Sequence, residues 1–417
     1  MVEVLFNLKS HQPREEGKKY KILTLHILEE KLKEVVTLLQ FTKQPTRQKS
    51  IDLTKGVEVR NMLEYRNDDI PIETNPVYKI IFPTDEDRDY LGELLKVKVT
   101  SNTRSIWYPH RPTHKDNGMM WVCGEIVQPK YPIYILSKGR WETRYTSKTL
   151  EEMGVLYKIV IEPQEYEQYS RYISKHKILV LPDEYLNKNQ GGIPARNFIW
   201  EHSIQQGHKA HWVIDDNIEG FFRWNRNKKL PCKSGLCFKY IEDYFDSCEN
   251  VGQCGIQYSS FYPEISLRRP LYIKNTRIYS CILQNNYVDL EERWRGKYNE
   301  DTDLSLRLLK KGYSTLLFQN FLCGKKTTLS VKGGNQEIYS GDGLQQKLDS
   351  LISQHPDVVT GTFKFKKVHH QVNYEPFKKN EIKYKSDYTF PVYPELVLMK
   401  DPKYTETIEE EEEDQQE

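Results

Sequence analysis

Residues 131–163 read YPIYILSKGRWETRYTSKTLEEMGVLYKIVIEP, and this stretch decides the fold. Short apolar runs at both of its ends enclose residues 147–154, which have the composition of a short helix that a glycine ends. The alternation continues with a predicted helix over 165–176 and a predicted strand over 177–182. Strands that alternate with helices are typical of βαβ units, whose crossover helices cover a mostly parallel sheet. The sequence therefore predicts an α/β domain.

The next predicted helix and strand lead to a pair of acids. The helix opens on Pro194 and closes at Gly207, because proline is favoured in the first turn of a helix and glycine directly after its end. The run HWVIDDNI follows, and its apolar part predicts a buried strand that ends at Asp215 and Asp216.

Outside this region the sequence predicts two further parts. The run VYKIIF, the acidic segment DEDRDYLGELL and the run KVKVT predict a strand, a helix and a strand, which together form a small α/β unit. A turn-rich stretch separates it from the larger domain. The C-terminal end, IEEEEEDQQE, has the composition of a solvated, disordered tail. We place the small module at residues 1–125, the main domain at 126–370 and the C-terminal extension at 371–417.

Composition excludes some classes of protein. The 61 Lys and Arg residues nearly balance 59 Asp and Glu residues, so no global excess of positive charge points to nucleic acid. No apolar run approaches the roughly 20 residues that span a bilayer, and the N-terminus lacks the apolar stretch of a signal peptide. Seven cysteines, an odd number in a long chain, favour buried thiols in a reducing compartment over a disulfide framework or a zinc site. We expect a cytoplasmic protein that does not bind membranes.

Polar side chains follow several predicted strands, and ligands bind at such strand ends in open α/β sheets. Ser137 and Arg140 follow the first strand, and a hydroxyl with a guanidinium suits an anionic or nucleoside ligand. Glu162 follows the second strand beside an aromatic residue, a pair that suits a uracil-like base. Arg196 lies in the first turn of the next helix, where free N–H groups favour phosphate. Each of these also fits an ordinary charged loop or helix start.

The acids after the fourth strand are the most informative residues. Asp215, Asp216 and Asn217 follow it directly, and adjacent carboxylates repel unless a cation neutralises them. A hard divalent cation, Mn²⁺ or Mg²⁺, does so while it bridges to phosphate oxygens. A turn rich in Asp and Asn is the competing interpretation. His355 is our candidate for a histidine that completes the cation site.

A second acidic cluster begins a predicted helix. The segment NEDTDLSLRLLKKG places Glu300, Asp301 and Asp303 in the first turn, where the helix dipole favours acids. Capping accounts for one or two of them, and three are more than capping requires. A carboxylate kept ionised there is able to accept the proton of a hydroxyl that attacks a sugar.

The order of these motifs resembles a known family. YILSKGR, VIEP, the GIPARN helix, VIDDN and NEDTDLSLRLLKKG together resemble glycosyltransferases of the GT-A fold, a Rossmann-like architecture. They look most like the TET-associated glycosyltransferase family of phages, eukaryotes and their viruses. The resemblance covers roughly residues 131–365, and the N-terminal segment resembles a small module attached to phage DNA-modification proteins.

The resemblance implies roles for the candidate residues. Ser137 and Arg140 would contact the nucleotide of a UDP-sugar donor, Arg196 its phosphates, and Asp215 to Asn217 would form the metal-binding element, with asparagine in its last place. Glu300 and Asp301 would match the acidic pair that supplies the catalytic base in inverting members of the family, with Asp301 as the first candidate. A glycine-rich loop that includes Gly333 and Gly334 would close over donor and acceptor. The implied acceptor is a hydroxymethylated or otherwise hypermodified pyrimidine in DNA.

Two clusters of cations and aromatic residues flank the predicted acids, and this composition suits phosphate contact and base stacking. Their members are Arg223, Trp224, Arg226, Lys228 and Lys229 in one cluster and Arg293, Trp294, Arg295 and Lys297 in the other. Two alternatives stay open. The same chemistry fits a protein, lipid or glycan acceptor, and a degenerate site would leave a non-catalytic nucleotide- or DNA-binding module.

Overall fold

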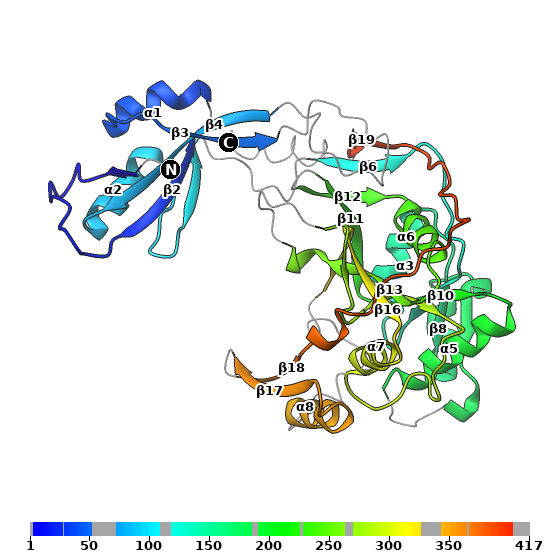
Figure 1. Ribbon diagram of the computed structural model, residues 1–417. Coiled ribbons are helices and arrows are strands. Elements are labelled where there is room, and N and C mark those ends of the chain that lie inside the picture. The colour runs from blue at the N-terminus through cyan, green and yellow to red at the C-terminus, as the bar shows by residue number, and fades with distance from the viewer. Residues whose placement is uncertain are drawn as a thin grey trace. The chain divides into compact units, whose positions relative to one another are not determined.

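The structure, a computed structural model, consists of two compact units, one made mainly of residues 3–119 and one mainly of residues 120–399 (Figure 1). The residues that it describes are 3–27, 29–51, 72–108, 118–185, 191–225, 228–262, 270–326, 343–364 and 367–402. Gly333 and Gly334, with the predicted glycine-rich loop, lie outside these residues.

The N-terminal unit is a sheet with two helices. Its elements are β1 (Glu3–Leu5), β2 (Lys21–Ile27), α1 (Leu32–Leu39), β3 (Thr46–Ile51), β4 (Ile72–Phe82), α2 (Asp85–Leu95) and β5 (Ser105–Tyr108). The strand order is β1-β4-β2-β5, and β3 also pairs with β4. Alternate residues of β2, such as Leu23 and Leu25, are buried with Val35 of α1 and Leu91 of α2. The period of two in β2 therefore places both helices against one face of the sheet.

The second unit is built on a large mixed sheet. Its strands are β6 (Met119–Cys123), β7 (Ile133–Leu136), β8 (Lys158–Ile161), β9 (Ile178–Val180), β10 (Ala210–Asp215), β11 (Ile218–Asn225), β12 (Lys228–Lys233), β13 (Val251–Tyr258), β14 (Tyr272–Lys274), β15 (Cys281–Asn285), β16 (Ser314–Lys325) and β19 (Leu396–Lys400). A separate hairpin pairs β17 (Val359–Lys364) with β18 (Lys367–Val372). The helices are α3 (Tyr145–Glu152), α4 (Tyr166–Ser170), α5 (Ile193–Gln205), α6 (Leu236–Asp246), α7 (Glu300–Lys310) and α8 (Gly343–Gln354). Short 3₁₀ helices cover Glu29–Lys31, Pro163–Glu165, Lys175–Lys177, Asp183–Tyr185, Ser259–Phe261 and Glu375–Phe377.

The predicted α/β class is confirmed. The sheet order is β19-β6-β12-β11-β16-β13-β15-β10-β7-β8-β9, with β14 paired to β16. Strands β10, β7, β8 and β9 are parallel, as their alternation with helices predicts. Antiparallel pairs join β15 to β10 and to β13, so the whole sheet is mixed. The predicted helix over 165–176 is much shorter, since α4 ends at Ser170.

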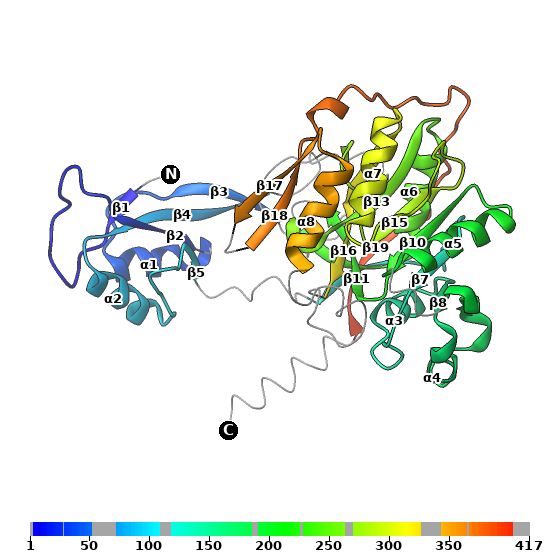
Figure 2. The same cartoon turned by 90° about the horizontal axis from the view of Figure 1, so that it is seen from below.

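Neighbouring residues of β10 pack helices on opposite faces of the sheet (Figures 1 and 2). Val213 packs in one core cluster with Trp200 of α5 and Leu304 of α7. Trp212 points the other way, and its ring lies 5.1 Å from that of Phe238 in α6. Because side chains alternate along a strand, one apolar run buries both faces of the sheet and fixes where β10 ends.

The cysteines agree with the expectation of buried thiols. All the cysteines are free thiols, buried in the core except Cys123, which is half-buried. Within the described residues no group of three or more metal-ligating side chains is assembled. No helix in the described part of the chain is long and apolar enough to cross a membrane.

We predict that Gly255→Ala in the middle of β13 strongly destabilises the second unit. A Cβ atom there would overlap the side chain of Ile278 and lie 2.9 Å from the carbonyl oxygen of Cys281. Overpacking of this kind costs about 1–3 kcal/mol. Gly124→Ala is the matched control, since a Cβ at that position meets nothing within 4 Å. Chemical denaturation should show a lower free energy of unfolding for the first variant only; equal midpoints would contradict the packing described here.

Candidate functional site

The site lies where β10 ends beside β7. Asp215 is paired in register with Leu136, so the loop that follows β7 lies next to the two acids. Thr146 at the start of α3 donates its hydroxyl to the backbone oxygen of Asp215 at 2.6 Å and accepts the N–H of Ile218 at 2.9 Å. The backbone of the acidic turn is thus held in one conformation by a side chain from a neighbouring helix.

The carboxylate of Asp216 turns toward the loop after β7. Its Oδ1 accepts a hydrogen bond from Arg140, with which it also forms an ion pair, and its Oδ2 accepts from the hydroxyl of Ser137 at 2.8 Å. Burial raises the pKa of Asp216, and the charge of Arg140 opposes this effect. Two of the predicted nucleotide-binding residues therefore contact a predicted metal ligand.

The carboxylate of Asp215 turns toward α5 and β16. Its Oδ1 lies 3.3 Å from Nη2 of Arg196, and its Oδ2 accepts from Ser280 at 2.6 Å and from Lys325 at 2.8 Å. Burial alone would raise the pKa of Asp215, but the charges of Lys325 and Arg196 outweigh it and lower the pKa to about 2. Asp215 is therefore an ionised carboxylate inside the protein.

Lys325 is a site residue that the sequence did not reveal. It ends β16 and is paired with Ile218, directly after the acidic turn. Besides Asp215, its ammonium group lies 2.8 Å from the hydroxyl of Ser280 and 3.2 Å from that of Tyr258. The only local signal is a lysine at the end of a long apolar run, which is also typical of an ordinary strand exit.

Arg196 links the acidic turn to the second acidic cluster. Its side chain is 7% exposed, and its guanidinium lies 4.7 Å from the ring centre of Trp294. Its Nε lies 3.7 Å from a carboxylate oxygen of Glu300, outside hydrogen-bond range. Nε and Nη1 are buried, and no described residue accepts a hydrogen bond from either. Buried guanidinium groups are normally paired, so this edge of Arg196 is suited to an anionic ligand.

The loop after β7 is fixed by residues beyond those predicted. The hydroxyl of Tyr169 lies 2.6 Å from that of Ser137 and accepts the N–H of Arg140 at 3.1 Å. Glu165 accepts the N–H of Gly139 at 2.8 Å, and burial raises the pKa of Glu165 to about 7. Glu162 contacts the same loop through Lys138, whose ammonium lies 3.1 Å from the carboxylate of Glu162.

The first turn of α7 carries the candidate bases. Burial and the neighbouring charge of Asp301 raise the pKa of Glu300, against the effect of Arg196. Asp301 is half-buried, and its Oδ1 accepts from the backbone N–H of Thr302 at 2.7 Å. The preceding Asn299 has a φ of 54°, and its side chain donates to the backbone oxygen of Lys347 at 2.8 Å. The turn that presents both acids is thus attached to α8.

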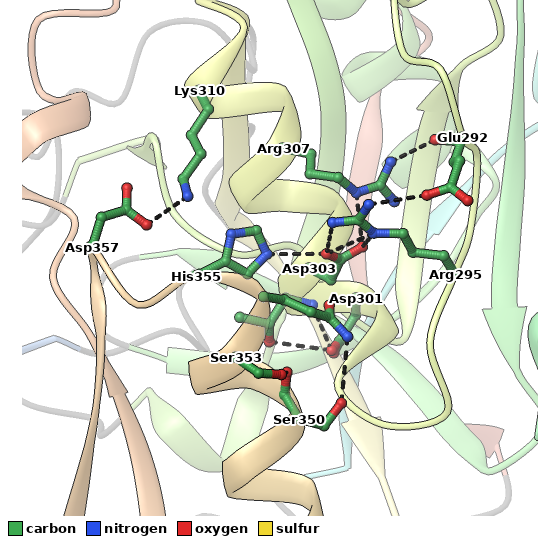
Figure 3. A network of polar contacts seen from close by, with 12 residues as sticks. Glu292, Arg295, Asp301, Asp303, Arg307, Lys310, Ser350, Ser353, His355 and Asp357 are labelled. Carbon is green, nitrogen blue, oxygen red and sulfur yellow. Dashed lines mark hydrogen bonds and ion pairs between the residues drawn. The ribbon is translucent and has the colours of Figure 1, made fainter.

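Asp303 and His355 form a separate buried network (Figure 3). His355 Nε2 lies 3.0 Å from Asp303 Oδ1, and Arg307 Nε donates to Asp303 Oδ2 at 2.8 Å. Arg295 lies 3.2 Å from the same carboxylate. The predicted metal site therefore separates into two groups, because His355 contacts Asp303 and not the acids at the end of β10. The side-chain amide of Asn217 donates a hydrogen bond to the backbone oxygen of Lys326 at 3.1 Å.

The predicted base-stacking clusters do not form exposed aromatic surfaces. Trp294 is 2% exposed beneath Arg196, and Trp224 is 3% exposed against Tyr262. Arg293 is paired with Glu201. The hypothesis that these tryptophans stack on bases was wrong, because both rings complete the core instead.

Comparison with known proteins identifies one family. The model of a family described as TET-Associated Glycosyltransferase matches residues 131–334, which run from the start of β7 to beyond Lys325. No curated protein matches the chain.

We predict that Asp303→Asn destabilises the second unit by about 3–5 kcal/mol, since it leaves buried cations without their counter-ion. Burial would raise the pKa of Asp303, but His355, Arg307 and Arg295 together lower it. The difference from the wild type should therefore be present at neutral pH and shrink as the pH falls below the usual aspartate range.

Asp357→Asn is the control for this variant. Asp357 forms an ion pair of 2.7 Å with Lys310 at the surface (Figure 3), and such pairs contribute about 0–1 kcal/mol. Urea denaturation at several pH values measures both. A loss for Asp303→Asn no larger than that for Asp357→Asn would contradict the network as a support of α7.

Proposed function

Since this chain belongs, through residues 131–334, to the TET-associated glycosyltransferase family and is a glycosyltransferase, we propose that it transfers a sugar from a nucleotide sugar to the hydroxyl of a hydroxymethylated pyrimidine in DNA. One observation carries the chemical part of this proposal. The guanidinium of Arg196 lies 3.3 Å from Asp215 and 3.7 Å from Glu300, so one acid at the strand end and one candidate base share a buried cation.

Support for the donor comes from the groups around that cation. Arg196 has two buried N–H-bearing nitrogens without a partner, and it lies in the first turn of α5, whose dipole favours negative charge. A diphosphate at this point would satisfy both. The loop over Ser137 to Arg140 is held next to the same acids and suits the nucleoside part of a UDP-sugar.

The reaction needs one group that accepts a proton. As the acceptor oxygen bonds to the sugar carbon, the bond from that carbon to the diphosphate oxygen breaks, and the nucleoside diphosphate leaves with the electron pair. The acceptor's proton passes to a carboxylate, for which we propose Asp301. Burial raises the pKa of the neighbouring Glu300, and its carboxylate lies 3.7 Å from Arg196, so we propose Asp301 before Glu300.

The acceptor in this proposal comes from the family, and the surroundings of Asp301 are compatible with a polyanion. Burial lowers the pKa of His370 to about 4, and the positive charges of Arg277 and Lys347 lower it further, while Asp301 opposes them. Cations thus gather near the candidate base, where they suit the phosphates that flank a base in DNA.

The direct test of the acceptor uses duplexes that carry 5-hydroxymethylcytosine, 5-hydroxymethyluracil or unmodified bases, incubated with the enzyme and a panel of nucleotide sugars. We expect mass spectrometry of the nucleosides to find sugar on a hydroxymethylated base and none on unmodified DNA. Transfer to protein, lipid or glycan acceptors but to no DNA would reject this acceptor class. Failure of every acceptor, together with no nucleotide binding, would favour a non-catalytic module.

Asp301→Asn should lower turnover by about 10²- to 10⁴-fold, the usual contribution of general-base catalysis, and leave donor affinity unchanged. Asp289→Asn is the control, because Asp289 is exposed and pairs only weakly with Lys311 at 3.4 Å. Single-turnover transfer rates and donor titrations measure the two effects. Near-wild-type turnover of Asp301→Asn would make Glu300 the next candidate.

A further inference from the structure

Divalent metal sites in enzymes that transfer phosphate-linked groups use carboxylate oxygens that face the ion, whereas each carboxylate oxygen of the acids at the end of β10 faces a side-chain donor. Both oxygens of Asp215 and both oxygens of Asp216 accept hydrogen bonds from side chains. The donors are Arg196, Ser280 and Lys325 for Asp215 and Arg140 and Ser137 for Asp216. Asp215 and Asp216, with these donors around them, do not fit a bound Mn²⁺ or Mg²⁺.

The positive charges around Asp215 and Asp216 also disfavour a divalent cation. Arg140, Arg196 and Lys325 bring three positive charges to the two carboxylates of Asp215 and Asp216. Glu300 adds a third acid near Arg196, and burial raises its pKa, which favours its neutral form. A divalent cation at Asp215 would lie close to the Lys325 ammonium and be repelled by it.

Three hydrogen-bond acceptors hold the ammonium group of Lys325 in place. Its ammonium has three N–H groups, and three acceptors surround it: the carboxylate of Asp215 at 2.8 Å, Ser280 at 2.8 Å and Tyr258 at 3.2 Å. Its backbone belongs to β16, which pairs with β11 across Ile218. The side chain is only 17% exposed, so moving the ammonium away from Asp215 would leave a buried carboxylate without its main counter-ion.

We propose that Lys325 takes the place of a divalent cation, and that this glycosyltransferase works without metal. Lys325 is a positioning residue, which holds the carboxylate of Asp215 in place through a charged hydrogen bond of 2.8 Å. Arg196 neutralises the negative charge of the leaving diphosphate, because no described residue accepts a hydrogen bond from its Nε or Nη1. The inference rests on the proposed donor chemistry but not on the choice of acceptor.

The first experiment uses Mn²⁺ alone and Mn²⁺ with UDP, followed by electron paramagnetic resonance of the ion. The wild-type protein should bind no Mn²⁺ beyond what UDP itself binds. Lys325→Met should gain a Mn²⁺ site, because Asp215 Oδ2 loses its ammonium partner. Lys326→Met is the matched control, since the neighbouring Lys326 forms a surface ion pair with Glu219 at 2.7 Å and should leave Mn²⁺ binding unchanged.

The second experiment measures UDP affinity by calorimetry in EDTA and in Mn²⁺. For the wild type and for Lys326→Met the affinity should be the same in both. For Lys325→Met it should fall about 10-fold or more in EDTA, as when a buried charge loses its partner, and recover in part with Mn²⁺. Sugar transfer should follow the same pattern.

Two outcomes overturn the inference: a wild-type Mn²⁺ site that Asp215→Asn removes, or wild-type UDP binding that EDTA abolishes and Mn²⁺ restores. Neither depends on whether Lys325→Met folds. If the wild type binds no Mn²⁺ and the lysine variant gains a site, while UDP and GDP bind neither protein, the proposed donor class fails and the counter-ion role of Lys325 stands.

Discussion

The partly buried carboxylate of Asp215, with its three side-chain donors, is the constraint on which the site at the end of β10 depends. A charge inside a protein is tolerated only when cations and hydrogen bonds replace the water that it loses. Here those groups are Arg196 of α5, Ser280 directly before β15, and Lys325 at the end of β16. One side chain thus fixes where a helix begins and where a distant strand ends, and the chemistry of the site follows from that arrangement.

The second acidic cluster, at the start of α7, is also held by a carboxylate that several side chains contact. Asp303 is fully buried in α7 and binds Arg307, Arg295 and His355, while Glu300 of the same turn lies 3.7 Å from Arg196. Acids of one helix turn therefore have different partners. Asp303 holds α7 against His355, in the segment after α8, and so positions the first turn that carries Glu300 and Asp301.

A site neutralised by its own side chains differs from a metal site in a physical way. A divalent cation arrives with the diphosphate and leaves with it, whereas Lys325 and Arg196 are fixed before the donor binds. Fixed cations need no reorganisation as charge develops on the leaving group. In the proposed donor complex, their lower charge density would make the guanidinium of Arg196, which lies over the ring of Trp294, more important for holding the diphosphate.

The sequence by itself determined the α/β class, the parallel strands β7, β8 and β10, and the presence of Ser137, Arg140, Asp215 and Asp216 at their ends, because strand and helix periods and strand-end residues are local features. It also placed Arg196 and Asp301 in the first turns of helices. Only the tertiary structure decided what these groups contact. Lys325 meets Asp215 across 110 residues, His355 meets Asp303 instead of the strand-end acids, and Trp224 and Trp294 enter the core. Such partners depend on how strands and helices pack, and packing brings together residues whose separation along the chain carries no periodic signal.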